Sequence, residues 1–283
     1  MSPSAKKPTP VKKNQRPASI RAAKPAFLNL VSDHMTLLVQ PSLYNFMYAF
    51  FRIVLGVPRE EIIYEKRRKW PGGAGEVSMT FAAKIGEVSR EKSAALARTA
   101  IAVVQPSEPS GQSSHVRTML DSRGAIAHWQ HVALRTPDLL SFHRHAAAHG
   151  VNFITPILKD QDEDLLQVFT GELFLPGTRP SGIFFEFVQR DLTPQLLRRL
   201  ASSDRQSWFR DRTFLGLYGE KEREYQSGRV TPILDHALMD RLQSLWRDRP
   251  VWSVTEEDLT EASRVMREYV RAKSGQRSAA AAP

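Results

Sequence analysis

Apolar and polar positions along the chain follow an order that occurs twice. In the first unit, residues 28–39 form an apolar, partly β-branched run that is typical of a buried strand. Pro41 opens a second apolar segment that ends at Gly56, as expected for a helix between start and stop signals. Three further strand candidates follow, at residues 61–68, 76–85 and 97–105.

The second unit repeats this order. Residues 127–136 form its first strand candidate, and a predicted helix follows Pro137 and ends at Gly150. Three strand candidates complete the unit, at residues 151–155, 164–170 and 182–189. Two βαβββ units can pair their sheets around a shared cleft, so the sequence predicts an α+β fold built from paired βαβββ modules.

The two ends of the chain differ from these units. Residues 1–26 are rich in Pro, Ser, Ala and Lys and have no apolar periodicity, which predicts a disordered basic tail. Residues 192–272 have helical spacing and few strand signals, so we expect a C-terminal helical extension. Residues 273–283 are expected to form a second disordered tail. The two modules therefore occupy residues 27–191.

Composition and charge limit the partners and the kinds of metal site that we expect for this chain. The net charge is +10, but seven Lys and Arg and no acidic residue lie within residues 1–25, so the rest carries only +3 and we expect no nucleic-acid partner. Because the chain has no cysteine, a metal would have to be held by His, Asp or Glu. No apolar run reaches about 18 residues and no secretory signal is present, which predicts a cytoplasmic protein without a membrane span.

Three residues are candidates for a metal site. Glu186 lies among apolar residues of a strand candidate, where a carboxylate needs a metal ion, an arginine or a proton to compensate its burial. His34 and His131 lie 97 residues apart, at equivalent positions of the two units. Taken alone, each histidine is typical of a hydrogen-bonded core histidine, and Glu186 is typical of a structural ion pair. Paired modules would bring them together, and two His with one carboxylate favour Fe(II) and O₂ chemistry, with zinc or manganese as alternatives.

Several segments resemble the catalytic half of the 4-hydroxyphenylpyruvate dioxygenase family, which belongs to the vicinal oxygen chelate superfamily of βαβββ modules. The segments are QHVALRTPDLL (130–140), DLLQVFT (164–170), FFEFVQRD (184–191) and SDHMTLLV (32–39). The resemblance covers roughly residues 28–191 and continues more weakly to about residue 226. It implies that His34, His131 and Glu186 are iron ligands. It also implies substrate contacts from Gln167, Ser78, Gln105 and Phe214.

One segment departs from this family. Where the family has a pair of glutamines on a strand, this chain has SSHVRTML (113–120). Strand alternation would put His115 and Arg117 on one face and into the substrate site. An arginine there suits a carboxylate or phosphate better than a phenol, so we expect 4-hydroxyphenylpyruvate to be a poor substrate.

The resemblance implies an Fe(II)-dependent dioxygenase that uses O₂ to decarboxylate and hydroxylate a small-molecule substrate, a 2-oxo acid that we expect to be aromatic or bulky. Alternatives within the superfamily are an extradiol-type dioxygenase and a metal-dependent isomerase or lyase. A metal-free binding protein of the same fold is the alternative from another class, although it would not need the His34, His131 and Glu186 set. A homodimer is a further expectation, because paired modules often also pair between chains.

Overall fold

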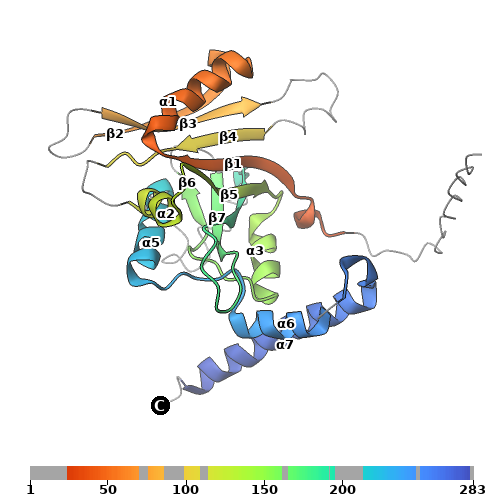
Figure 1. Ribbon diagram of the computed structural model, residues 1–283. Coiled ribbons are helices and arrows are strands. Elements are labelled where there is room, and N and C mark those ends of the chain that lie inside the picture. The colour runs from red at the N-terminus through yellow and green to blue at the C-terminus, as the bar shows by residue number, and fades with distance from the viewer. Residues whose placement is uncertain are drawn as a thin grey trace, which may run out of the picture.

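A computed structural model gives the fold of the protein (Figure 1). It describes residues 24–69, 76–85, 99–108, 114–160, 165–190, 192–194, 213–246 and 249–280. Residues 1–23 of the predicted N-terminal tail and residues 195–212 of the predicted helical extension lie outside the described residues. Among the described residues, no helix combines the length and apolar character needed to cross a membrane.

The described strands form one eight-stranded sheet in the order β2-β3-β4-β1-β5-β8-β7-β6. The first module contributes β1 (Val31–Val39), β2 (Ile62–Lys69), β3 (Glu76–Ile85) and β4 (Thr99–Val104). The second module contributes β5 (Ala127–Arg135), β6 (Leu158–Asp160), β7 (Leu165–Glu172) and β8 (Phe184–Gln189). In each module the first strand pairs in parallel with the last, and β1 and β5 join the modules as an antiparallel pair. The predicted α+β fold of paired βαβββ modules is therefore confirmed.

The junction between the modules is symmetric. His34 pairs with Ala133, and Thr36 pairs with His131. Since 97 residues separate His34 from His131 and Thr36 from Ala133, each pair is the symmetry mate of the other. The spacing seen in the sequence thus becomes a pseudo-twofold axis between β1 and β5.

Strand alternation assigns the helices to the two faces of the sheet. One face is covered by α1 (Pro41–Ala49), which continues into a π-helical turn, and by α3 (Leu139–Ala148). The other face carries Leu38 and Val104, which pack against α2 (His115–Arg123). The helix α5 (Thr213–Ser227) lies on this second face as well, with Lys221 over the ring of Phe184 (Figure 1).

Three sequence predictions differ from the structure. The segment predicted as a strand at 113–120 forms α2 instead, because the side chain of Ser114 caps its first turn and Gly124, at φ 59°, ends it. The strand expected at 151–155 is reduced to isolated bridges, and β6 follows it. After α6 (His236–Trp246), the last helix α7 (Glu256–Ala280) continues beyond the expected end at residue 272.

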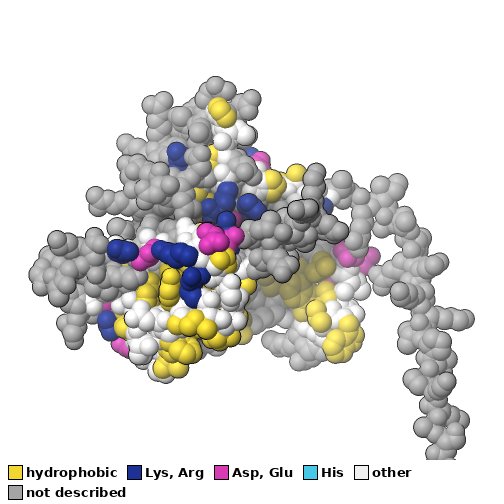
Figure 2. Space-filling model, turned by 90° about the horizontal axis from the view of Figure 1, so that it is seen from above, with side chains coloured by type: hydrophobic (Ala, Val, Ile, Leu, Met, Phe, Trp, Pro, Cys, Tyr) yellow, Lys and Arg dark blue, Asp and Glu magenta, His cyan; other side chains and the backbone are white. Residues whose placement is uncertain are grey.

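The surface of the described residues is mixed in charge. Figure 2 shows Lys and Arg side chains beside acidic ones near the middle of the face seen from above. This mixture agrees with the small net charge of the chain outside its N-terminal segment.

Candidate metal centre

Three neighbouring strands bring His34, His131 and Glu186 together around Ala133. His34 on β1 and Glu186 on β8 both lie directly opposite Ala133, which belongs to the strand between them. His131 precedes Ala133 by two residues on β5 and therefore points to the same face. The small side chain of Ala133 is fully buried, so it leaves room for the three larger side chains above it.

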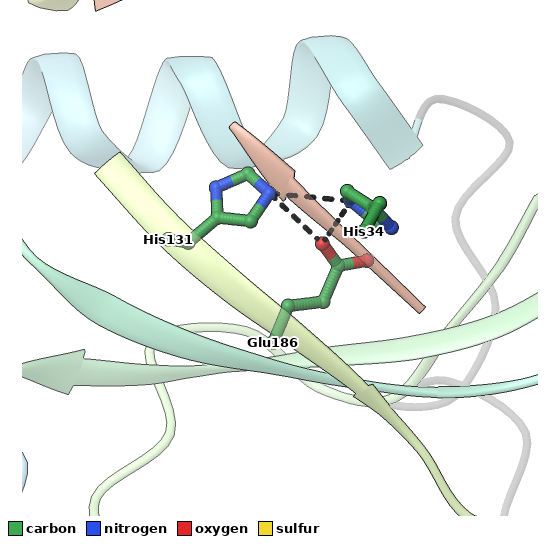
Figure 3. Close-up of side chains that lie close together, drawn as sticks. All are labelled: His34, His131 and Glu186. Atoms are coloured by element: carbon green, nitrogen blue, oxygen red, sulfur yellow. Dashed lines mark hydrogen bonds and ion pairs between the residues drawn. The ribbon is translucent and has the colours of Figure 1, made fainter. Parts of the chain in front are cut away.

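The nitrogen and oxygen atoms of these side chains form a nearly equilateral triangle (Figure 3). Glu186 Oε2 lies 3.2 Å from His34 Nε2 and 3.2 Å from His131 Nε2, and the two nitrogens are 3.3 Å apart. Nitrogen and oxygen ligands bind metals at about 2.0–2.2 Å, so three of them around one ion lie roughly 3.0–3.5 Å apart. The three side chains therefore have the spacing that a divalent metal ion requires.

Charge and burial favour a cation at this position. Burial raises the pKa of Glu186, but His34 and His131 outweigh it and lower the pKa to about 2. Burial lowers the pKa of His34, whereas Glu186 and Asp33 raise it to about 9. Burial lowers the pKa of His131 more than Glu186 raises it. The buried carboxylate thus has basic nitrogens as its partners, which fits both a metal site and the structural ion pair that the sequence left open.

A β-bulge precedes each of the two histidines. Asp33 is the extra residue of β1, and Gln130 is the extra residue of β5. A bulge redirects a side chain that would otherwise alternate to the opposite face. As a result, Asp33 Oδ1 accepts a hydrogen bond from His34 Nδ1 at 3.0 Å, and Gln130 Oε1 accepts one from His131 Nδ1 at 3.2 Å. Both imidazoles are held with Nε2 towards the centre.

Each of these bulge residues has a further partner. Arg190 donates two hydrogen bonds to the carboxylate of Asp33, at 2.9 and 2.8 Å. Gln130 Nε2 donates to His115 Nε2 at 2.9 Å. Burial, with Lys221 and His131 nearby, lowers the pKa of His115 to about 3, so this ring is neutral and can accept that bond. An ionic contact therefore orients His34, and a neutral one orients His131.

The substrate residues implied by the resemblance have different positions. Gln167 on β7 is buried and shares the face of the ligands, two residues from Phe169, which lies opposite Glu186. Gln105 is buried directly after β4, where its N–H donates to the carbonyl of Met79. Ser78 belongs to β3 and Phe214 to α5, but their side chains lie outside the described residues.

The prediction for His115 and Arg117 is wrong in its geometry. On a helix, residues two apart point about 200° away from each other, so these two do not share a face. His115 is buried and binds Gln130. Arg117 Nε donates to the buried carboxylate of Glu108 at 2.6 Å. The expectation that 4-hydroxyphenylpyruvate is a poor substrate loses the argument on which it depended.

Sequence reasoning missed the two bulge residues. Asp33 and Gln130 lie 97 residues apart, and each directly precedes one of the histidines. The repeat spacing marks them as equivalent positions, but the bulges that turn them towards the histidines follow from the register of β1 and β5. The hydroxyl of Thr36, which lies 2.9 Å from His131 Nε2, was missed as well.

The helix α5 is attached beside the centre by a buried ionic cluster. Lys221 Nζ donates to Glu172 Oε1 and to Glu224 Oε2, both at 2.9 Å, and Lys221 and Glu172 are fully buried. Lys221 also lies 5.1 Å from the centroid of Phe184, whose ring lies 5.2 Å from that of His131. The cluster closes the side of the centre on which His131 lies.

The strand order and the pairing of the modules are those of the vicinal oxygen chelate fold. The chain has this fold. No protein-family model matches the chain, and no curated protein matches it.

Some solved structures are similar at low identity. For a variant of 4-hydroxymandelate synthase from Streptomyces coelicolor, the TM-score is 0.44 and the identity 17%, over 69% of this chain and 55% of that one. A variant of methylmalonyl-CoA epimerase from the same organism, in complex with 2-nitronate-propionyl-CoA, is similar as well. Its TM-score is 0.39 and its identity 16%, over 57% of this chain and 98% of that one. The chain thus spans little more than half of the synthase, and likeness at these values says nothing about the reaction.

Proposed function

We propose that the protein is an Fe(II)-dependent dioxygenase that decarboxylates and hydroxylates a 2-oxo acid. The observation that carries the proposal is the triangle of His34, His131 and Glu186, whose ligand atoms lie 3.2–3.3 Å apart on one face of three strands. Two histidines and one carboxylate with further positions open are the ligand set of non-haem Fe(II) oxygenases.

The symmetry of the modules supports an open centre. In the second module Ala133 of β5 lies opposite Glu186 of β8, and in the first module Thr36 of β1 lies opposite Ala102 of β4. Since Thr36 is the symmetry mate of Ala133, Ala102 occupies the position equivalent to Glu186. A carboxylate there could act as a fourth ligand, whereas the methyl group of Ala102 cannot. The position is therefore left for substrate or O₂.

The residues of the chain would prepare the centre. Fe(II), when bound, supplies the redox chemistry with O₂ and a template for the carboxylate and keto oxygens of a 2-oxo acid. Asp33 and Gln130 accept hydrogen bonds from Nδ1 of the two histidines, so both Nε2 lone pairs face the centre, where a metal would replace the contact of the Thr36 hydroxyl with His131 Nε2. The buried rings of Phe169 and Phe184 lie 6.4 and 5.2 Å from the ring of His131 and exclude water from this side.

The test is gas exchange with a panel of 2-oxo acids after anaerobic loading with Fe(II). We expect O₂ uptake with equal release of CO₂, which is lost in Glu186→Ala and kept in Glu268→Ala, a control on the exposed side of α7. O₂ uptake with catechols and no CO₂ would favour the extradiol alternative. Turnover without O₂ would favour an isomerase or lyase, and ligand binding that does not need metal would favour a binding protein.

A further inference from the structure

A second row of residues crosses the sheet beside the candidate metal centre. Arg135 follows Ala133 by two residues on β5 and lies opposite Val188 on β8, which in turn lies opposite Gln167 on β7. All of them point to the face that carries His34, His131 and Glu186, because strand alternation is undisturbed over these residues. The row next to the ligands therefore has an amide at one end and a guanidinium at the other.

The charge of Arg135 is weakly compensated. Its Nε lies 3.9 Å from Asp33 Oδ2, which is beyond hydrogen-bond distance. Both oxygens of Asp33 already accept shorter bonds, from Arg190 and from His34. Among the described residues, Asp33 is the ionic partner of Arg135, and this contact does not use the hydrogen-bond donors of the guanidinium.

The fold does not require a charge at this position. The symmetry mate of Arg135 in the first module is Leu38, which is fully buried against α2. The side chain of Arg135 is instead 40% exposed. The arginine is therefore not part of a core as Leu38 is, and its guanidinium lies at the solvent-exposed side of the row.

The centre is also more open on this side. The side chain of His34 is 19% exposed, compared with 8% for His131 and 3% for Glu186. Phe184 and α5 close the side on which His131 lies, whereas Asp33 and Arg135 lie on the side of His34. A substrate that reaches the centre past His34 would pass the guanidinium of Arg135.

We propose that Arg135 binds a second anionic group of the substrate, so that the substrate class is a 2-oxo acid with a distal carboxylate. The contacts run from the guanidinium of Arg135 to the carboxylate of Asp33 and then to the imidazole of His34. Asp33 therefore lies between the guanidinium of Arg135 and the ligand atoms. When the 2-oxo acid end of a substrate lies at the centre, its far end would reach the guanidinium. The inference rests on the proposed function.

The test is anaerobic calorimetry of the Fe(II)-loaded full-length protein with 2-oxoglutarate and 2-oxopentanoate. The two probes have the same chain length, but only 2-oxoglutarate has a second carboxylate. We expect wild type to bind 2-oxoglutarate about tenfold more tightly, as a charge-assisted hydrogen bond would contribute. Arg135→Gln should remove this preference and leave 2-oxopentanoate binding unchanged, and Arg135→Lys should keep part of it. The control Arg59→Gln removes the same charge from an exposed site and should change neither.

Affinity for Fe(II) is the second measurement. It should be equal in wild type and Arg135→Gln, whereas a loss would mean that Arg135 acts by holding Asp33 and would overturn the assignment. Equal binding of both probes by wild type, or an equal loss of both in the variant, would also overturn it while leaving the proposed function intact. Failure of the Fe(II)-loaded protein to bind either probe would overturn the assignment of Arg135, whereas the proposed function would be overturned by the absence of O₂ uptake with every 2-oxo acid of the panel.

Discussion

Replacing Gln130 by methionine would remove two hydrogen bonds behind a proposed metal ligand and keep the length of the side chain. The bond from His131 Nδ1 to Gln130 Oε1 at 3.2 Å orients the imidazole. The bond from Gln130 Nε2 to His115 at 2.9 Å fixes Gln130 itself. Because Gln130 is fully buried, water cannot replace either partner. The substitution itself changes none of the three proposed ligand residues.

The expected loss is in metal affinity. Removal of a hydrogen-bond partner of a ligating histidine typically costs 10–100-fold in affinity, which corresponds to about 1.4–2.7 kcal/mol. Stability should fall as well, by about 1–3 kcal/mol, because the acceptor on the buried ring of His115 loses its donor. The first effect is specific to the centre, whereas the second would follow from any buried polar pair.

Anaerobic calorimetry with Fe(II) and with Zn(II) measures the first effect, and urea unfolding of the metal-free protein measures the second. Gln226→Met is the matched control, since Gln226 lies exposed on α5 and should leave both quantities unchanged. A Gln130→Met variant that folds and binds both metals within about twofold of wild type would refute the reasoning. His131 would then be oriented by its strand alone.

Three further predictions concern other parts of the chain. Glu186→Ala should abolish Fe(II) binding in calorimetry and keep the circular dichroism spectrum, because the apolar strand around it remains; binding within tenfold of wild type would contradict this. Glu172→Gln should lower the free energy of unfolding in urea by about 1.5–3 kcal/mol, because it removes the charge of one of the two carboxylates that Lys221 contacts and leaves Glu224 as its ionic partner, and adding Lys221→Met should restore part of the loss. Deletion of residues 1–25 should leave O₂ uptake unchanged, so a several-fold loss would assign this segment to the site or to assembly.

The proposed metal ligands could be predicted from patterns in the sequence. His34 and His131 could be found because each lies at the same place in one of two repeated units. Pairing of the units then superimposes equal positions around one axis, so spacing alone predicts that the two side chains meet. Glu186 could be found because a carboxylate within an apolar strand needs a partner. These inferences depend on periodicity, which is a property of each segment by itself.

The helix at His115 marks the limit of this reasoning. The resemblance to a family that has a strand at this place predicted a strand for residues 113–120, and this prediction took no account of the helix signals Ser114 and Gly124. The apolar residues Val116, Met119 and Leu120 of this segment have helical spacing, but this spacing matters only because Leu38 and Val104 offer a surface for them. Local caps at Ser114 and Gly124, together with contact to β1 and β4, decided the secondary structure.

Tertiary structure alone decided which polar residues reach the centre. Asp33 and Gln130 alternate with the histidines in sequence and would face away from them on regular strands. They face the histidines because each is a bulge residue, and a bulge arises from the register of two strands that lie about 100 residues apart in the chain. Arg135 could not be distinguished from other arginines in the same way, since its position beside Asp33 depends on how β5 pairs with β1. The sequence determined the modules and the proposed ligands of a metal, whereas the register between the modules determined what surrounds them.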